Sequence, residues 1–84
     1  MFYNKISLQG LRQVLRKFDE DGMYASGTHW SIGRGGYDLQ WELSYDRVPI
    51  IDCVGGVLEN NCLSDEDFKR ISKVIREEYR WVKK

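Results

Sequence analysis

Residues 37–45 read YDLQWELSY, and apolar and polar side chains alternate through the whole stretch without an exception. Consecutive side chains of an extended chain point to opposite sides of a sheet, so this alternation predicts a strand with one buried face and one solvent-exposed face. An antiparallel sheet that is covered on one side only is the usual source of such a pattern. The polar residues of the stretch, expected on the exposed face, are Asp38, Gln40, Glu42 and Ser44.

Helical periodicity lies on both sides of this strand. Behind Ser7, whose hydroxyl suits an N-cap, apolar residues recur at helical spacing, and we expect a helix over about residues 8–19. Ser64 precedes a second apolar stripe, with three carboxylates in the first turn that complement the positive end of a helix dipole. This second helix should reach about Val82.

Turn signals divide the chain between the two helices into short strands. Glycines supply the positive φ angles that tight connections need, and two-residue turns favour antiparallel hairpins. The expected order is a loop over 23–27, a strand over 28–32, a Gly-Arg-Gly-Gly hairpin connection over 33–36, the strand over 37–45, a turn at 46–47, a strand over 48–54, a Gly-Gly turn at 55–56 and a short strand over 57–60.

The turn at 46–47 also predicts a register between the two strands that it joins. Tyr45 should face Val48, and Leu43 should face Ile50, which keeps the apolar side chains on one side of the sheet. Ile51 follows Ile50 directly, so one of these two isoleucines is expected on the exposed face.

These elements predict one α+β domain over residues 1–84: a helix, a three- to four-stranded antiparallel meander and a second helix. Both helices carry a single apolar stripe, and we expect both to pack on the same face of the sheet. A chain of 84 residues, 42% of them hydrophobic, has material for one modest core.

Composition narrows the class of protein. The chain has thirteen Lys and Arg and thirteen Asp and Glu, so its formal net charge is zero. Composition therefore gives no reason to expect that the protein binds nucleic acid or an acidic substrate. The N-terminal residues carry no apolar run typical of a signal peptide, and no apolar stretch is long enough to cross a bilayer. We therefore expect a cytoplasmic protein without membrane contact, in which Cys53 and Cys62 are reduced, buried thiols.

Charge is nevertheless unevenly placed along the chain. Basic residues recur at helical spacing on the second helix, nearly opposite its apolar stripe, so they should face solvent. Asp38 and Glu42 should lie on the exposed sheet face, with Asp46 nearby, which makes the two outer layers opposite in sign. The basic residues are Lys69, Lys73, Arg76, Arg80 and Lys83. They could contact the phosphates of a nucleic acid, or they could simply form the solvated face of the helix.

Two further residues are candidates for contact with a partner. Arg34 lies in the glycine-rich connection, where we expect it at an exposed hairpin tip, available to an acidic partner. Trp81 lies at the margin of the apolar stripe of the second helix, and aromatic residues at such margins are favoured in protein interfaces.

Residue types suited to catalysis or metal binding are few. His29 is the only histidine, and its nearest candidate partners in the strand model are Ser31, Asp52 and Cys53, but nothing in their spacing builds a triad. His29, Cys53 and Cys62 lack the close spacing of metal knuckles. We expect no catalytic residue, metal or cofactor.

The sequence favours a small non-enzymatic protein-binding module, for example an inhibitor or an accessory protein of a phage or mobile element. Its expected partner is another protein, contacted through Arg34, Asp38, Glu42 and Trp81, and a homodimer is also compatible with the sequence. The alternative is a nucleic-acid-associated protein that uses the basic face of the second helix. A third hypothesis is a small enzyme or ligand-binding domain near His29.

Overall fold

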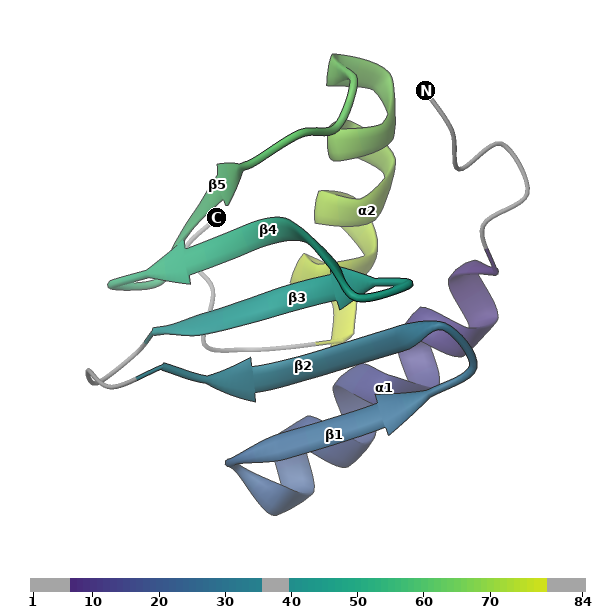
Figure 1. Cartoon of the computed structure of the whole chain (residues 1–84), viewed down its shortest axis with the longest axis vertical. Coiled ribbons are helices and arrows are strands. Elements are labelled where there is room, and N and C mark those ends of the chain that lie inside the picture. Colours follow the sequence, from purple (N-terminus) through teal and green to yellow (C-terminus); the bar gives the residue numbers. More distant parts are fainter. Residues whose placement is uncertain (1–6, 36–39, 79–84) are drawn as a thin grey trace.

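Two helices and one antiparallel sheet make up the fold in the computed structural model, which describes residues 7–35 and 40–78. The strands hydrogen-bond in chain order, β1-β2-β3-β4-β5 (Figure 1). This arrangement confirms the predicted α+β class, with five strands in place of three to four. The elements are α1 (Leu8–Asp21), β1 (Tyr24–Gly27), β2 (Trp30–Arg34), β3 (Trp41–Tyr45), β4 (Val48–Val54), β5 (Val57–Asn60) and α2 (Asp65–Glu78).

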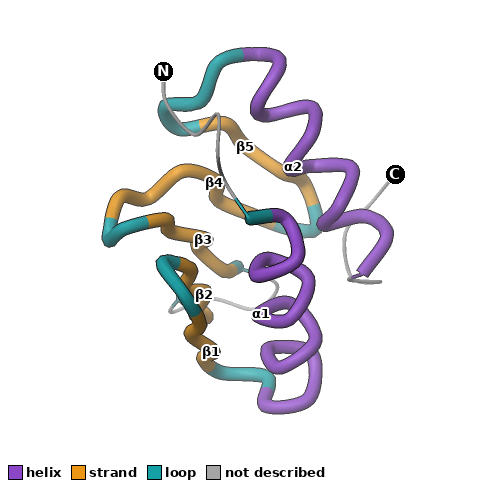
Figure 2. Tube along the Cα trace, turned by 90° about the vertical axis from the view of Figure 1, so that its right-hand side faces the viewer, coloured by secondary structure: helices purple, strands orange, loops and turns teal. Residues whose placement is uncertain are grey.

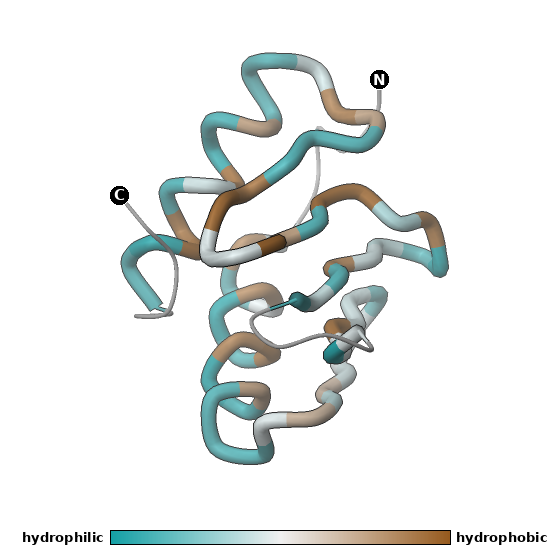
Figure 3. Tube along the Cα trace, turned by 90° about the vertical axis from the view of Figure 1, so that its left-hand side faces the viewer, coloured by the Kyte–Doolittle hydropathy of each residue, from teal (hydrophilic) through white to brown (hydrophobic). Residues whose placement is uncertain are grey.

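Both helices cover the same face of the sheet, as predicted. Figure 2 shows the two layers side by side, with α1 and α2 on one side and the five strands on the other. Along α1 and α2, brown apolar residues recur between teal hydrophilic ones (Figure 3). The opposite face of the sheet, called the outer face here, is covered by no described element. The helices and the inner face of the sheet share one core, whose largest fully buried side chains are Leu11, Leu15, Phe18, Trp30, Ile32, Trp41, Leu43, Ile50, Ile51, Ile71 and Ile75.

The caps of α1 explain its limits. The Ser7 hydroxyl accepts a hydrogen bond from the Gly10 amide at 3.2 Å, which confirms the predicted N-cap. At the other end Gly22 adopts φ +82°, and its amide donates to the Phe18 carbonyl at 2.7 Å. A left-handed C-cap of this kind is easy for glycine, so the helix continues to Asp21, two residues beyond the expected end.

The prediction of a loop over residues 23–27 is wrong, because residues 24–27 form β1. Its sequence YASG has only one buried side chain, that of Ala25, so it lacks the alternation that marks a strand. Tertiary packing explains its place: a Cβ on Gly27 would lie 2.9 Å from Cγ2 of Val14, so α1 packs very closely over this strand. Packing against α1 and pairing with β2 therefore determine this strand more than the β propensity of its own residues does.

The second strand begins and ends later than expected. It covers residues 30–34 instead of 28–32, and its register pairs Gly33 with Glu42 and Arg34 with Trp41. Gly33 and Arg34 are therefore strand residues. The prediction that placed both of them in the hairpin connection is wrong. Residues 37–39 of the expected central strand lie outside the described residues.

A bulge between β3 and β4 changes the predicted register. Tyr45 pairs with Val48 as expected, but Leu43 pairs with Ile51 and not with Ile50, because the register shifts between Leu43 and Ser44. Ile50 is the extra residue on β4. Both isoleucines are consequently buried, each with an exposed fraction of 0%, and the expectation that one would face solvent is wrong.

The remaining turns and the second helix follow the prediction. Asp46 and Arg47 have φ angles of +50° and +69°, and Gly55 and Gly56 of +61° and +82°, typical of two-residue hairpin turns. The second turn leads into β5. The Ser64 hydroxyl accepts from the Asp67 amide at 3.2 Å and begins α2. The expected extension of this helix beyond residue 78 lies outside the described residues. In the described part of the chain, neither helix is long and apolar enough to span a membrane.

Candidate functional site

The outer face carries a row of residues in register, one from each strand. The strand registers place Tyr24 opposite Gly33, Gly33 opposite Glu42, Glu42 opposite Asp52 and Asp52 opposite Glu59. Side chains in register on neighbouring strands point to the same face, so these residues form one line across the sheet. We call Glu42, Asp52 and Glu59 the carboxylate row.

The carboxylate row is electrostatically unfavourable within the chain itself. Like charges directly opposite each other on adjacent strands destabilise a sheet. In the described parts of the chain, no Lys, Arg or His side chain forms an ion pair with any of the three carboxylates. This face therefore presents negative charge that the described residues leave unneutralised.

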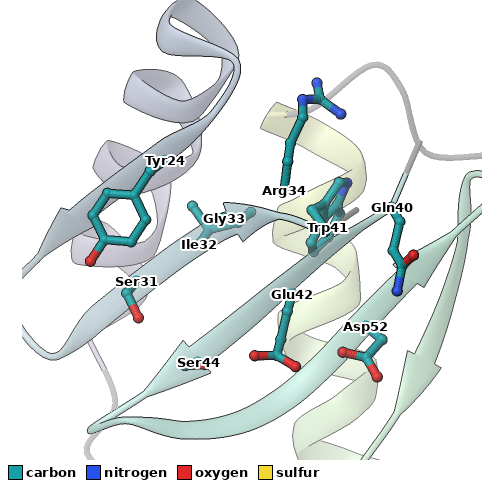
Figure 4. Close-up of a pocket in the computed structure, with 11 residues that line it drawn as sticks. Tyr24, Ser31, Ile32, Gly33, Arg34, Gln40, Trp41, Glu42, Ser44 and Asp52 are labelled. Carbon is teal, nitrogen blue, oxygen red and sulfur yellow. The ribbon is translucent and has the colours of Figure 1, made fainter. Parts of the chain in front are cut away.

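A hollow of about 350 Å³ lies beside the row. Gly33 has no side chain and forms part of its floor, between Tyr24 on β1 and Glu42 on β3. In Figure 4 the Tyr24 ring lies on one side of the hollow, and the carboxylates of Glu42 and Asp52 lie next to each other on the other side. Ser31, Ser44 and Gln40 also line it.

A pair of exposed valines extends this face toward the β4–β5 turn. Val54 and Val57 pair with each other in register, and their exposed fractions are 46% and 52%. Because Val54 has the same parity as Asp52, and Val57 the same parity as Glu59, both valines point to the outer face. The outer face thus combines apolar, aromatic and acidic side chains.

Arg34, predicted as an exposed tip residue, has a different position. It lies at the end of β2 and is half-buried, its Nε donates to the Gly22 carbonyl, and its guanidinium stacks over the Phe18 ring at 5.3 Å from the centroid. Figure 4 shows its guanidinium pointing away from Glu42 and Asp52. Arg34 therefore ties β2 to the C-terminal end of α1 and leaves the carboxylates without compensation from this side chain.

The other predicted contact residues are placed only in part. Glu42 is exposed on the outer face, as expected. Asp38 and Trp81 lie outside the described residues. Asp52 and Glu59 were missed as members of the same surface. The Gly55–Gly56 turn places Glu59 opposite Asp52, but the register expected from the turn at 46–47 puts Ile51 opposite Glu42. Only the bulge in β4 brings Asp52 beside Glu42, and the alternation pattern carries no signal for it.

The basic residues of α2 are found where the sequence predicts them. Lys69, Lys73 and Arg76 are exposed, whereas Arg80 and Lys83 lie outside the described residues. On α1, Arg12 and Arg16 are engaged by carboxylates of α2. The interhelical ion pairs are Arg12–Glu78 at 2.8 Å, Arg12–Glu77 at 2.9 Å and Arg16–Glu78 at 3.0 Å.

These ion pairs shift the pKa values of Glu78 and Arg12. Hydrogen bonds from Arg16 and then from Arg12 hold the pKa of Glu78 below its ordinary value. The hydrogen bonds to Glu78 and Glu77 correspondingly raise the pKa of Arg12. The cluster links the two helices through side chains of both.

His29 has a partner that the sequence analysis did not consider. It lies in the β1–β2 turn with φ +67°, and its Nδ1 is 2.6 Å from Oδ1 of Asp46 in the neighbouring β3–β4 turn. Its ring lies against Tyr45, with centroids 5.6 Å apart. The candidate partners named from the sequence lie elsewhere: Ser31 and Asp52 line the hollow on the outer face, and Cys53 is in the core.

The two cysteines are free and differ in exposure. Cys53 is buried opposite Leu58, and burial raises the pKa of its thiol. Cys62 is exposed, so the expectation of two buried thiols is wrong for this residue. The described residues contain no group of three or more His, Cys, Asp or Glu side chains placed to hold a metal ion.

Comparisons with protein-family models, with curated proteins and with solved structures found no match. Any functional proposal for this chain therefore rests on the geometry and chemistry of its described residues.

Proposed function

We propose that this chain is a small, non-enzymatic protein-binding module and that the outer face of the sheet is its docking surface. The observation that carries this proposal is the carboxylate row, three acidic side chains in register on a sheet face that no described element covers. An inhibitor or an accessory protein of a phage or mobile element would use a surface of this kind.

The chemistry of the outer face supports a protein partner over a small substrate. The hollow lies on a sheet face that no described element covers, and this face has exposed Val54 and Val57 at one end and Tyr24 at the other. Interfaces commonly combine a few apolar and aromatic contacts with charged groups that select the partner. The charge on this face selects for a partner with a basic surface.

Affinity capture from the source cells tests the proposal when matched charge reversals are compared. The outer-face variant carries Glu42→Lys and Asp52→Lys, and the control carries Lys69→Glu and Lys73→Glu on α2. We expect wild type and control to retain the same specific partner and the outer-face variant to lose it. Circular dichroism of both variants establishes that the fold is intact. Retention by the outer-face variant and loss by the control would contradict the proposal.

The second candidate function is nucleic-acid contact through α2. The observation that favours it is the exposure of Lys69, Lys73 and Arg76 on one helix face, where no described carboxylate forms an ion pair with them. A row of such cations can neutralise successive phosphates and release counterions.

Salt dependence separates the two candidates. Binding of a fluorescent duplex through this face should weaken steeply between low and physiological salt, and Lys73→Glu with Arg76→Glu should abolish it. The outer-face variant serves as the control and should bind the duplex at least as well as wild type. A weak affinity that is independent of salt and of these substitutions would exclude this function.

A further inference from the structure

We infer that the partner inserts an arginine side chain into the hollow above Gly33, between the Tyr24 ring and the carboxylates of Glu42 and Asp52. This inference rests on the proposed function, because it specifies the chemistry of the partner that docks on the outer face. The occupant is a protein segment with an exposed arginine, and the argument for it is complementarity of charge and shape.

The size of the hollow suits one long side chain. Its volume of about 350 Å³ is at the lower end of the range for sites that hold a complete small ligand, about 300–1,000 Å³. Gly33 adds no side chain to the hollow, whereas every other residue of its row carries one, and the Tyr24 ring borders the space above it. A Cβ at this position would lie 3.3 Å from Cδ1 of Tyr24, so even a methyl group would crowd the ring.

The polar groups around the hollow accept hydrogen bonds from a cation. Glu42 and Asp52 face each other across β3 and β4, which places two carboxylates side by side at one wall. Ser31 and Ser44, paired in register on β2 and β3, add hydroxyl oxygens. Arg34 also lines the hollow, and its guanidinium is engaged with Gly22 and Phe18.

The aromatic wall favours arginine over lysine. Tyr24 is exposed to 57%, so part of its ring is available to a ligand. A planar guanidinium stacks on an aromatic ring and donates several hydrogen bonds in a fixed fork, whereas an ammonium acts as a compact, strongly hydrated charge. A hollow with one ring on one side and two adjacent carboxylates on the other matches the first geometry.

The test is a titration of the isotope-labelled protein, followed by NMR, with a capped pentapeptide that has one central arginine. Two matched peptides carry lysine or neutral citrulline at the same position. We expect a dissociation constant on the order of 1 mM for the arginine peptide and at least about tenfold weaker binding of the citrulline peptide. The largest amide shifts should fall on Tyr24, Gly33, Glu42 and Asp52.

Protein variants assign the site. Gly33→Ala fills the floor and Glu42→Gln removes one carboxylate, and each should weaken binding of the arginine peptide about tenfold or more. Glu66→Gln removes an exposed carboxylate from α2 and should leave binding unchanged. Equal shifts with the arginine and citrulline peptides, or unchanged binding in both hollow variants, would overturn the inference.

The outcomes also separate this inference from the proposed function. In one outcome, partner capture is lost in the Glu42→Lys, Asp52→Lys variant but retained in Gly33→Ala, and the arginine peptide gives no shifts. The proposed docking surface is then supported, and the inference of an inserted arginine is wrong. If the Glu42→Lys, Asp52→Lys variant also retains the partner, both the docking surface and the inserted arginine are contradicted. Shifts of the same amides with protein concentration alone would assign the face to a second copy of the chain and overturn the inference.

Discussion

Glu42 lies directly opposite Asp52 on adjacent strands, and Glu59 lies opposite Asp52 on the next strand. Three carboxylates in register lower the stability of a sheet that could instead carry neutral or alternating charges. Binding surfaces are frequently suboptimal for stability in this way, because their charges are selected for a partner.

Neutralising one member of the carboxylate row should therefore stabilise the fold. We expect Glu42→Gln to raise the free energy of unfolding by about 0.2–1 kcal/mol at low salt, with a smaller gain at high salt where charges are screened. Urea denaturation at the two salt concentrations measures this. Glu66→Gln is the control: it removes a favourable charge from the first turn of α2 and should lower stability by about 0.3–1 kcal/mol. A Glu42→Gln protein less stable than wild type would contradict the repulsion.

The bulge in β4 predicts that two adjacent isoleucines are equally important. Because Ile50 and Ile51 are both fully buried, Ile50→Ala and Ile51→Ala should each lower the free energy of unfolding by about 2–5 kcal/mol. Val48→Ala, at an exposed position on the same strand, should cost much less. A regular strand without the bulge would leave one of the two isoleucine variants near wild-type stability, and that result would refute the register.

These two isoleucines show where sequence reasoning stopped. Alternation in 37–45 was enough to predict a strand with a covered face, which the structure describes over 41–45, and Ser7, Ser64 and the two hairpin turns were enough to place the starts of both helices and the strands β4 and β5. Strict alternation cannot represent a bulge, since one inserted residue changes the parity of everything beyond it. Strand β1 was missed for a different reason: its side chains carry little signal, and Gly27 is placed by close packing against Val14.

Arg34 should behave as a structural residue. Arg34→Lys keeps the charge but loses the planar group that stacks on Phe18 and donates to Gly22, so we expect a loss of about 1–3 kcal/mol in unfolding free energy. Arg76→Lys, on the exposed face of α2, should change stability by less than about 0.5 kcal/mol. Thermal or urea denaturation of both variants decides the matter, and equal stability of the two would show that the Arg34 contacts contribute nothing.

The interhelical ion pairs predict a dependence of stability on pH. The pKa of Glu78 is lowered in the folded state by Arg16 and Arg12, so between the folded and unfolded pKa values the unfolded chain binds more protons. The contribution of Glu78 should be complete above about pH 5 and should be lost as the pH falls below about 4, the usual range of a glutamate. Melting temperatures of wild type and Glu78→Gln should therefore converge in acid. A difference between them that is constant from pH 7 to pH 3 would contradict this role.

The candidate site was predicted only in outline, and the reason is geometric. The sequence placed Glu42 on an exposed face, and the structure confirms that position. The row with Asp52 and Glu59 depends on the registers of two hairpins at once, one of which contains the bulge. The hollow depends on Gly33 being a strand residue instead of a loop residue. Arg34 was misplaced by the same shift of two residues at the end of β2.

Site-specific photo-crosslinking in the source cells tests the docking surface most directly. A photoreactive phenylalanine analogue replaces Val57 on the outer face or, for comparison, Lys73 on α2, both of which are exposed. We predict a covalent adduct with one partner protein from position 57 and none from position 73, and its loss when Glu42→Lys and Asp52→Lys are added. An adduct that forms only from position 73, or one from position 57 that survives the two reversals, would contradict the account.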